Sequence, residues 1–75
     1  MQKPLNEKRE RLLALFKVAI EREQESQKLY ADIAETCEDD DLRQVIETLR
    51  ASERMHEDVL LERYKFITAD AQFKD

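Results

Sequence analysis

The chain has 75 residues, with no glycine, one proline, one cysteine and a net charge of −5. Because glycine and proline, which usually mark turns and the ends of strands, are almost absent, the sequence favours helices. Its length allows one domain at most. One cysteine excludes an intrachain disulfide, and the acidic balance argues against a nucleic-acid partner.

The longest apolar run, Leu12 to Phe16, is far shorter than the ~20 residues that a helix needs to span a bilayer. The N-terminus does not have the layout of a signal peptide. We therefore expect a cytoplasmic protein with no membrane partner.

The first predicted element is one long amphipathic helix over about residues 6–37. Pro4 is tolerated near its first turn, and Asn6 is the predicted N-cap. The prediction depends on apolar residues that recur every three or four positions, namely Leu12, Leu15, Phe16, Ala19, Ile20, Tyr30, Ile33 and Ala34.

An acidic run interrupts this pattern and predicts a turn over about residues 38–40. Asp41, followed by Gln44, resembles a capping box and is expected to start a second helix over about residues 41–67. The tail over residues 68–75 has only Phe73 as an apolar anchor and is expected to fray. The second helix has its own apolar series, Leu42, Val45, Ile46, Leu49, Val59, Leu60, Tyr64 and Ile67.

Two long helices joined by a short turn predict an all-α fold, an antiparallel two-helix hairpin. A hairpin leaves half of each apolar stripe in contact with water. Two hairpins that pair into a four-helix bundle cover these stripes, so we expect a homodimer or a higher even-numbered homo-oligomer.

Three polar residues lie on the apolar stripes: Glu23 on the first helix, and Glu53 and His56 on the second. With the turn centred near residue 39, Glu23 lies 16 residues before it, and Glu53 and His56 lie 14 and 17 residues after it. At about 1.5 Å of rise per residue, all three fall in nearly one cross-section of the hairpin. They are the predicted metal ligands.

A two-fold dimer around this level would hold four carboxylates and two imidazoles. Two divalent cations, one for each chain, would neutralise the carboxylates, and oxygen and imidazole ligands suit iron, manganese or zinc. Tyr30 on the same stripe could donate a hydrogen bond to a ligand. A Glu-x-x-His spacing alone is common on charged helices, so the prediction depends on the joint placement of Glu23, Glu53 and His56.

The segment from Ala19 through Glu23 to Tyr30, together with the segment from Ala51 to His56 and the later Tyr64, resembles the ferritin-like superfamily, closest to its rubrerythrin-like members. The resemblance covers about residues 15–64. Members of full length carry two such helical pairs, so this chain is most similar to the half-sized ferritins, which include the encapsulated ferritins.

The resemblance implies a ferritin-like four-helix bundle with a di-iron centre shared between two subunits. It implies ferroxidase activity, the oxidation of Fe(II) to Fe(III) by oxygen or peroxide, for iron storage or detoxification. The catalytic residues would then be Glu23, Glu53 and His56. Glu53 would bridge the two irons, and Glu23 and His56 would hold each iron terminally; manganese or zinc could substitute.

Encapsulated ferritins also imply an encapsulin-type shell as a partner, inside a protein nanocompartment. The tail ending at Asp75 shows no segment like their targeting peptide, and no paired Cys-x-x-Cys motif of a rubredoxin-like domain is visible. Two alternatives to the ferroxidase remain open: a metal-dependent structural or assembly module, and a metal-free helical interaction protein.

Overall fold

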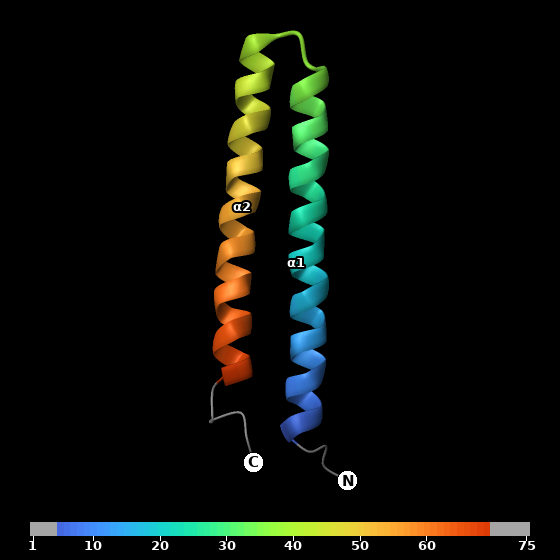
Figure 1. The fold of residues 1–75 in the computed structure, drawn as a ribbon, viewed down its shortest axis with the longest axis vertical. Helices are drawn as coiled ribbons and strands as arrows, with labels where there is room; N and C mark the ends of the chain where they lie inside the picture. Colours follow the sequence, from blue (N-terminus) through green and yellow to red (C-terminus); the bar gives the residue numbers. More distant parts are fainter. Residues whose placement is uncertain (1–4, 70–75) are drawn as a thin grey trace.

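The computed structural model describes residues 5–69, and the side chains of residues 7–69. It is a hairpin of two α-helices, α1 (Leu5–Thr36) and α2 (Asp40–Ala69), which lie side by side and antiparallel (Figure 1). The predicted all-α hairpin is confirmed, and the predicted helix bounds lie within two residues of those observed. Thr68 and Ala69, predicted to fray, are helical; the rest of the predicted tail lies outside the described residues.

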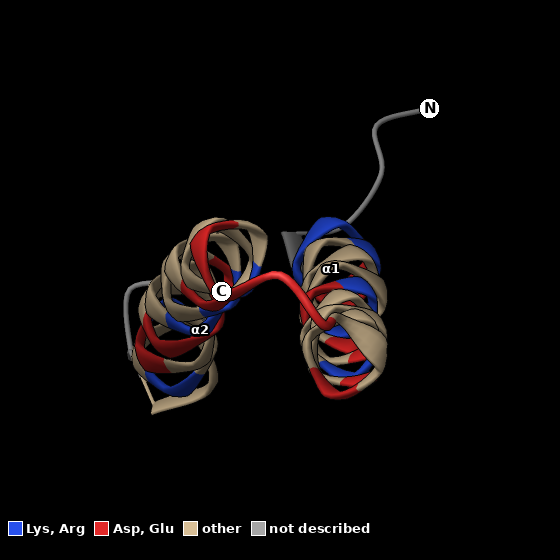
Figure 2. Cartoon of the chain, turned by 90° about the horizontal axis from the view of Figure 1, so that it is seen from above, with Lys and Arg blue, Asp and Glu red and all other residues tan. Residues whose placement is uncertain are grey.

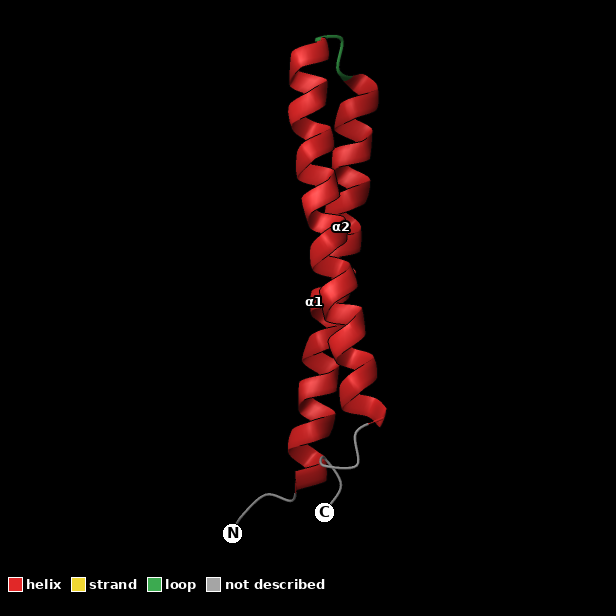
Figure 3. Ribbon diagram, turned by 90° about the vertical axis from the view of Figure 1, so that its left-hand side faces the viewer, coloured by secondary structure: helices red, strands yellow, loops and turns green. Residues whose placement is uncertain are grey.

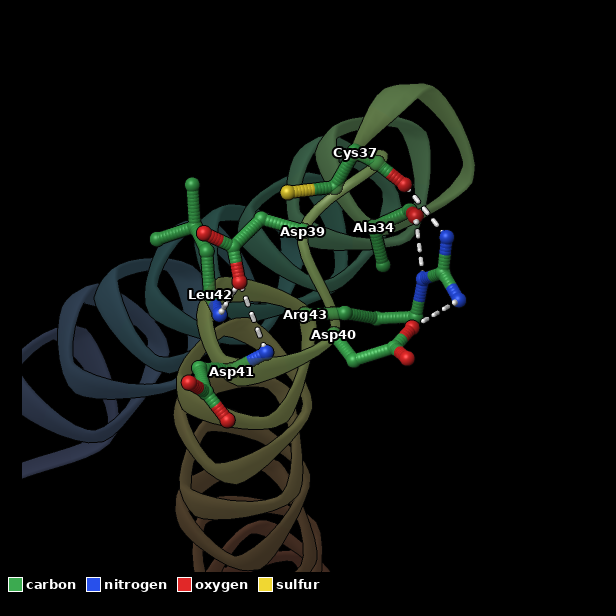
Figure 4. Close-up of polar contacts among 7 residues, drawn as sticks. All are labelled: Ala34, Cys37, Asp39, Asp40, Asp41, Leu42 and Arg43. Carbon is green, nitrogen blue, oxygen red and sulfur yellow. Dashed lines mark hydrogen bonds and ion pairs between the residues drawn. The ribbon is translucent and has the colours of Figure 1, made fainter.

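The N-terminus of α2 is capped by Asp39, not by the predicted Asp41. One oxygen of the Asp39 carboxylate accepts hydrogen bonds from the backbone N–H groups of Asp41, at 2.8 Å, and Leu42, at 3.2 Å (Figure 4). These are the second and third residues of the helix, whose N–H groups have no partner within it. Similarly, the predicted cap Asn6 lies inside α1, because that helix begins before it.

Arg43 of α2 caps the C-terminal end of α1, where no glycine is present to do so. Its guanidinium donates hydrogen bonds to the carbonyl oxygens of Ala34, at 3.2 Å, and of Cys37, and it pairs with the carboxylate of Asp40 at 3.3 Å (Figure 4). The last carbonyls of a helix lack partners within it and carry partial negative charge. An arginine from the next helix therefore satisfies these carbonyls and ties the two helices at the turn. The connection itself is acidic (Figure 2).

The hairpin has a thin core. In the described part of the chain, the buried apolar residues are Ile20, Ala34 and Ile67. At the open end, the Arg9 guanidinium donates a hydrogen bond to the backbone oxygen of Thr68 at 3.3 Å and ties α1 to the end of α2. The molecule measures 58 × 20 × 13 Å, and a narrow pair of helices encloses little volume (Figure 3).

Large apolar side chains remain exposed along both helices. Helical spacing places them around the side of the hairpin on which Glu23 contacts His56. We call this set the apolar face; it comprises Leu15, Val18, Leu29 and Ile33 of α1 and Leu42, Val45, Leu49, Met55, Val59 and Phe66 of α2. Neither helix, over the residues described, has a stretch apolar and long enough to cross a membrane.

Candidate metal centre

The hairpin brings the three predicted ligands together. Glu23 comes from α1, and Glu53 and His56 come from successive turns of α2. One ligand atom from each residue lies within 4.8 Å of the other two. The His56 Nδ1 atom is 3.5 Å from the nearest oxygen of both Glu23 and Glu53. The sequence prediction that these residues converge at one level is therefore confirmed as geometry.

The spacings of His56 from the two glutamates suit a shared cation, and the ligand atoms of Glu23 and Glu53 lie within 4.8 Å of each other. Two ligand atoms that each lie about 2.1 Å from a common ion are about 3.0–3.4 Å apart at octahedral and tetrahedral angles. The observed 3.5 Å separations are close to this range. Acidic groups also gather without an ion, so the fit depends on how these groups are partnered.

Glu23 is poorly partnered. Its Oε2 atom is buried and accepts no hydrogen bond from any described residue, although it lies 3.5 Å from His56 Nδ1. Burial raises the pKa of the Glu23 carboxyl, the neighbouring Glu53 raises it further, and His56 partly offsets both effects. A desolvated carboxylate beside a second carboxylate is unfavourable unless a proton or a cation joins it.

The centre opens toward solvent on the apolar face. The side chains of Glu23 and Glu53 are each 22% exposed, whereas that of His56 is 58% exposed. His56 continues the apolar series of α2, since Leu49, Ser52, His56 and Val59 follow one another at spacings of three and four. The centre is thus partly open to solvent within one chain, because a hairpin has only two layers.

A second polar cluster lies behind the centre, and sequence reasoning missed it. Glu57 accepts hydrogen bonds from the side-chain amides of Gln24, at 2.7 Å, and Gln27, at 2.6 Å. These two bonds lower the pKa of the Glu57 carboxyl. Its signal in the sequence is position alone, because Gln24 follows Glu23 and Glu57 follows His56.

Tyr30, predicted to support the ligands, is partly buried on α1. Among the described residues, no hydrogen bond of its hydroxyl to Glu23, Glu53 or His56 is present, so its supporting role stays a prediction. Cys37 lies at the end of α1 as a free, partly buried thiol.

No protein-family model, curated protein or solved structure matches the chain. The resemblance to the ferritin-like superfamily therefore stays a prediction that depends on the spacing of the ligand residues.

Proposed function

We propose that the protein is a ferroxidase whose di-iron site is completed by a second copy of the chain. The observation that carries this proposal is the convergence of Glu23, Glu53 and His56, from two helices, to within 4.8 Å of one another. Two carboxylates and one imidazole are half of the donor set of di-iron carboxylate bundles. Iron is here the substrate.

The exposed surface supports the second copy. The chain exposes 6299 Å², whereas a compact monomer of this 9.0 kDa mass would expose about 4,900 Å². A standard interface buries about 800 Å² on each partner. The apolar face offers the side chains for such an interface, and it surrounds the exposed His56. Pairing of two copies across this face would bury two half-sites against each other.

The proposed reaction oxidises two Fe(II) ions. Each ion loses one electron, and dioxygen takes the two electrons with two protons and leaves as hydrogen peroxide. Glu23 and His56 would hold each ion terminally, and Glu53 would bridge the pair, as the family resemblance implies. Four carboxylates from two chains neutralise two divalent ions, so the site binds ferrous iron without a large excess of charge.

The test is aerobic oxidation of ferrous iron, followed by the ferric absorbance. Glu53→Ala and His56→Ala should each lower the oxidation rate by more than about 10-fold. Loss of a residue that only hydrogen-bonds to a metal ligand already lowers activity by about that factor. Glu21→Ala is the matched control, because Glu21 is an exposed glutamate of α1 outside the three-residue cluster. Rates in both ligand variants equal to the control rate would contradict the ferroxidase.

One observation favours a second candidate, a metal-dependent assembly module without turnover. The core of the hairpin is so thin that an ion held between two chains would itself stabilise the fold. In that case zinc or manganese would drive dimer formation as well as iron does, and no oxygen would be consumed. A metal-free helical interaction protein would form the same oligomer with or without a chelator.

A further inference from the structure

Two glutamines of α1 hold one carboxylate of α2 on the side of the hairpin away from the apolar face. The Gln27 Nε2 atom donates to Glu57 Oε1 at 2.6 Å, and the Gln24 Nε2 atom donates to Glu57 Oε2 at 2.7 Å. We call these three residues the glutamine clamp. Both oxygens of the carboxylate are engaged, and hydrogen bonds to an ionised acceptor are about twice as strong as neutral ones.

The glutamine clamp is linked directly to the ligand residues. Gln27 lies one turn after Glu23 and also donates to the backbone oxygen of Glu23 at 3.4 Å. Glu57 follows His56 and lies one turn after Glu53. Movement of either helix along the other would therefore shift the clamp and the metal centre together.

The direction of the side chains explains why these residues meet. Helical side chains lean toward the N-terminus of their own helix. Gln27 is nearer to the turn than Glu23 and leans toward the open end, whereas Glu57 is farther from the turn than Glu53 and leans toward it. The side chains of Gln27 and Glu57 thus lean toward the level of the metal centre from opposite directions and meet behind it.

We infer that Gln24, Gln27 and Glu57 are positioning residues, which fix the axial register of α1 against α2 so that Glu23 reaches the ion held by Glu53 and His56. This inference rests on the proposed metal centre, but it adds residues that are not ligands. Among the described residues, these are the hydrogen bonds that join a side chain of α1 to a side chain of α2. The three ligands alone do not fix this register, because the contacts of His56 with both carboxylates are longer, at 3.5 Å.

A metal site tolerates little error in register. Ligand atoms must be held to within about 0.5 Å of the productive geometry, while one residue of axial slip displaces a helix by about 1.5 Å. The thin apolar core resists such slip weakly, since few side chains interlock between the helices. Loss of the clamp should therefore reduce metal affinity more than it reduces helix content.

The test uses the full chain and Co²⁺, whose visible absorption reports both binding and coordination geometry. Gln27→Met removes the shorter of the two hydrogen bonds of the clamp and Glu57→Met removes both, and each keeps the side-chain length. Glu57→Gln keeps one acceptor oxygen. Gln44→Met and Glu62→Met are the matched controls, because both residues are exposed on α2 and lie outside the clamp. Circular dichroism identifies a temperature at which every variant keeps its full helix content, and Co²⁺ binding is measured at that temperature.

We expect Gln27→Met and Glu57→Met to weaken Co²⁺ binding by about 10-fold or more and to change the visible spectrum, as loss of outer partners of a metal site does. Glu57→Gln should recover part of the affinity, and both controls should bind as the wild type does. If Gln27→Met and Glu57→Met both bound Co²⁺ with the wild-type affinity and spectrum, this inference would be overturned, while the proposed metal centre would stand. A wild-type chain that binds no Co²⁺ would overturn the proposed metal centre, and this inference with it. If a methionine variant does not fold, Glu57→Gln decides, and wild-type affinity in it would count against the clamp.

Discussion

At the scale of single residues, the Glu23 carboxylate favours metal binding but lowers the stability of the metal-free chain. Its buried Oε2 atom has no hydrogen-bond partner among the described residues, and burial beside Glu53 raises the pKa of its carboxyl. The ionised form that a cation needs is thus the form that the apo structure disfavours. Such a conflict between stability and activity is typical of functional sites.

Glu23→Gln should therefore stabilise the metal-free protein at neutral pH while it weakens metal binding. The folded-state pKa of Glu23 lies above its unfolded value, so the folded state binds more protons in that range and the contribution of Glu23 to stability falls as pH rises through the folded pKa. In a chelating buffer, the melting temperature of Glu23→Gln should exceed that of the wild type at pH 7, and the difference should shrink in acid below the unfolded pKa.

Glu57 affects the pH dependence of stability in the opposite sense but does not disturb this comparison. The glutamine amides lower the pKa of Glu57, so its contribution is present above the unfolded pKa and is lost as pH falls through the folded pKa. Glu57 is shared by the wild type and Glu23→Gln, so its effect cancels in the comparison. A Glu23→Gln variant that melts below the wild type at pH 7 without metal would contradict the proposed role of Glu23.

At the scale of the elements, the two helices are determined mainly by local sequence, and their ends by side chains next to the turn. The acidic run could satisfy the first N–H groups of α2 from more than one position, and Asp39 does so. Asp39→Ala should lower the free energy of unfolding by about 1 kcal/mol, the usual loss for a capping residue. Asp41→Ala, which removes a neighbouring carboxylate of α2, should have a smaller effect.

The measurement is urea unfolding at one fixed chain concentration, because the stability of an oligomer depends on concentration. Equal losses of unfolding free energy in Asp39→Ala and Asp41→Ala would show that the general charge of the first turn, and not the Asp39 cap, stabilises this end of α2.

Periodicity predicted both helices, the turn and the level of Glu23, Glu53 and His56, because a helix converts sequence spacing into position with little freedom. The cap at Asp39 was missed because several carboxylates compete for the same N–H groups. The glutamine clamp was missed for another reason. The contact of Glu57 with Gln24 and Gln27 depends on how far two long polar side chains reach across the hairpin, which periodicity does not encode.

At the scale of the whole molecule, the distribution of apolar side chains determines what a lone hairpin can do. In the described part of the chain, buried apolar residues are few, and the large exposed ones gather on the apolar face with His56 among them. A small domain with so little core is marginal alone and generally needs a metal or a second copy. The fold, the proposed dimer and the metal centre therefore depend on the same surface.

A single substitution on this surface should disrupt both assembly and metal binding. Val59 is exposed on the apolar face, one turn from His56. Val59→Lys would place a charge in the proposed interface, and burial of an unpaired charge costs several kcal/mol. Since every 1.4 kcal/mol is about 10-fold in a dissociation constant, the dimer should weaken by more than about 10-fold. Zinc affinity should fall as well, although Val59 is not a ligand, because each chain supplies half of the proposed site.

Light scattering and zinc titration of the same samples test this linkage. Glu35→Lys is the control, since Glu35 is exposed on the side of α1 that carries Lys17 and Gln24; it should keep the wild-type mass and affinity. Added zinc should raise the oligomer mass of the wild type at low chain concentration, because an ion held by two chains binds only their complex. If Val59→Lys were monomeric but bound zinc as the wild type does, Glu23, Glu53 and His56 of one chain would form a complete site, and the second copy would serve only to cover the apolar face.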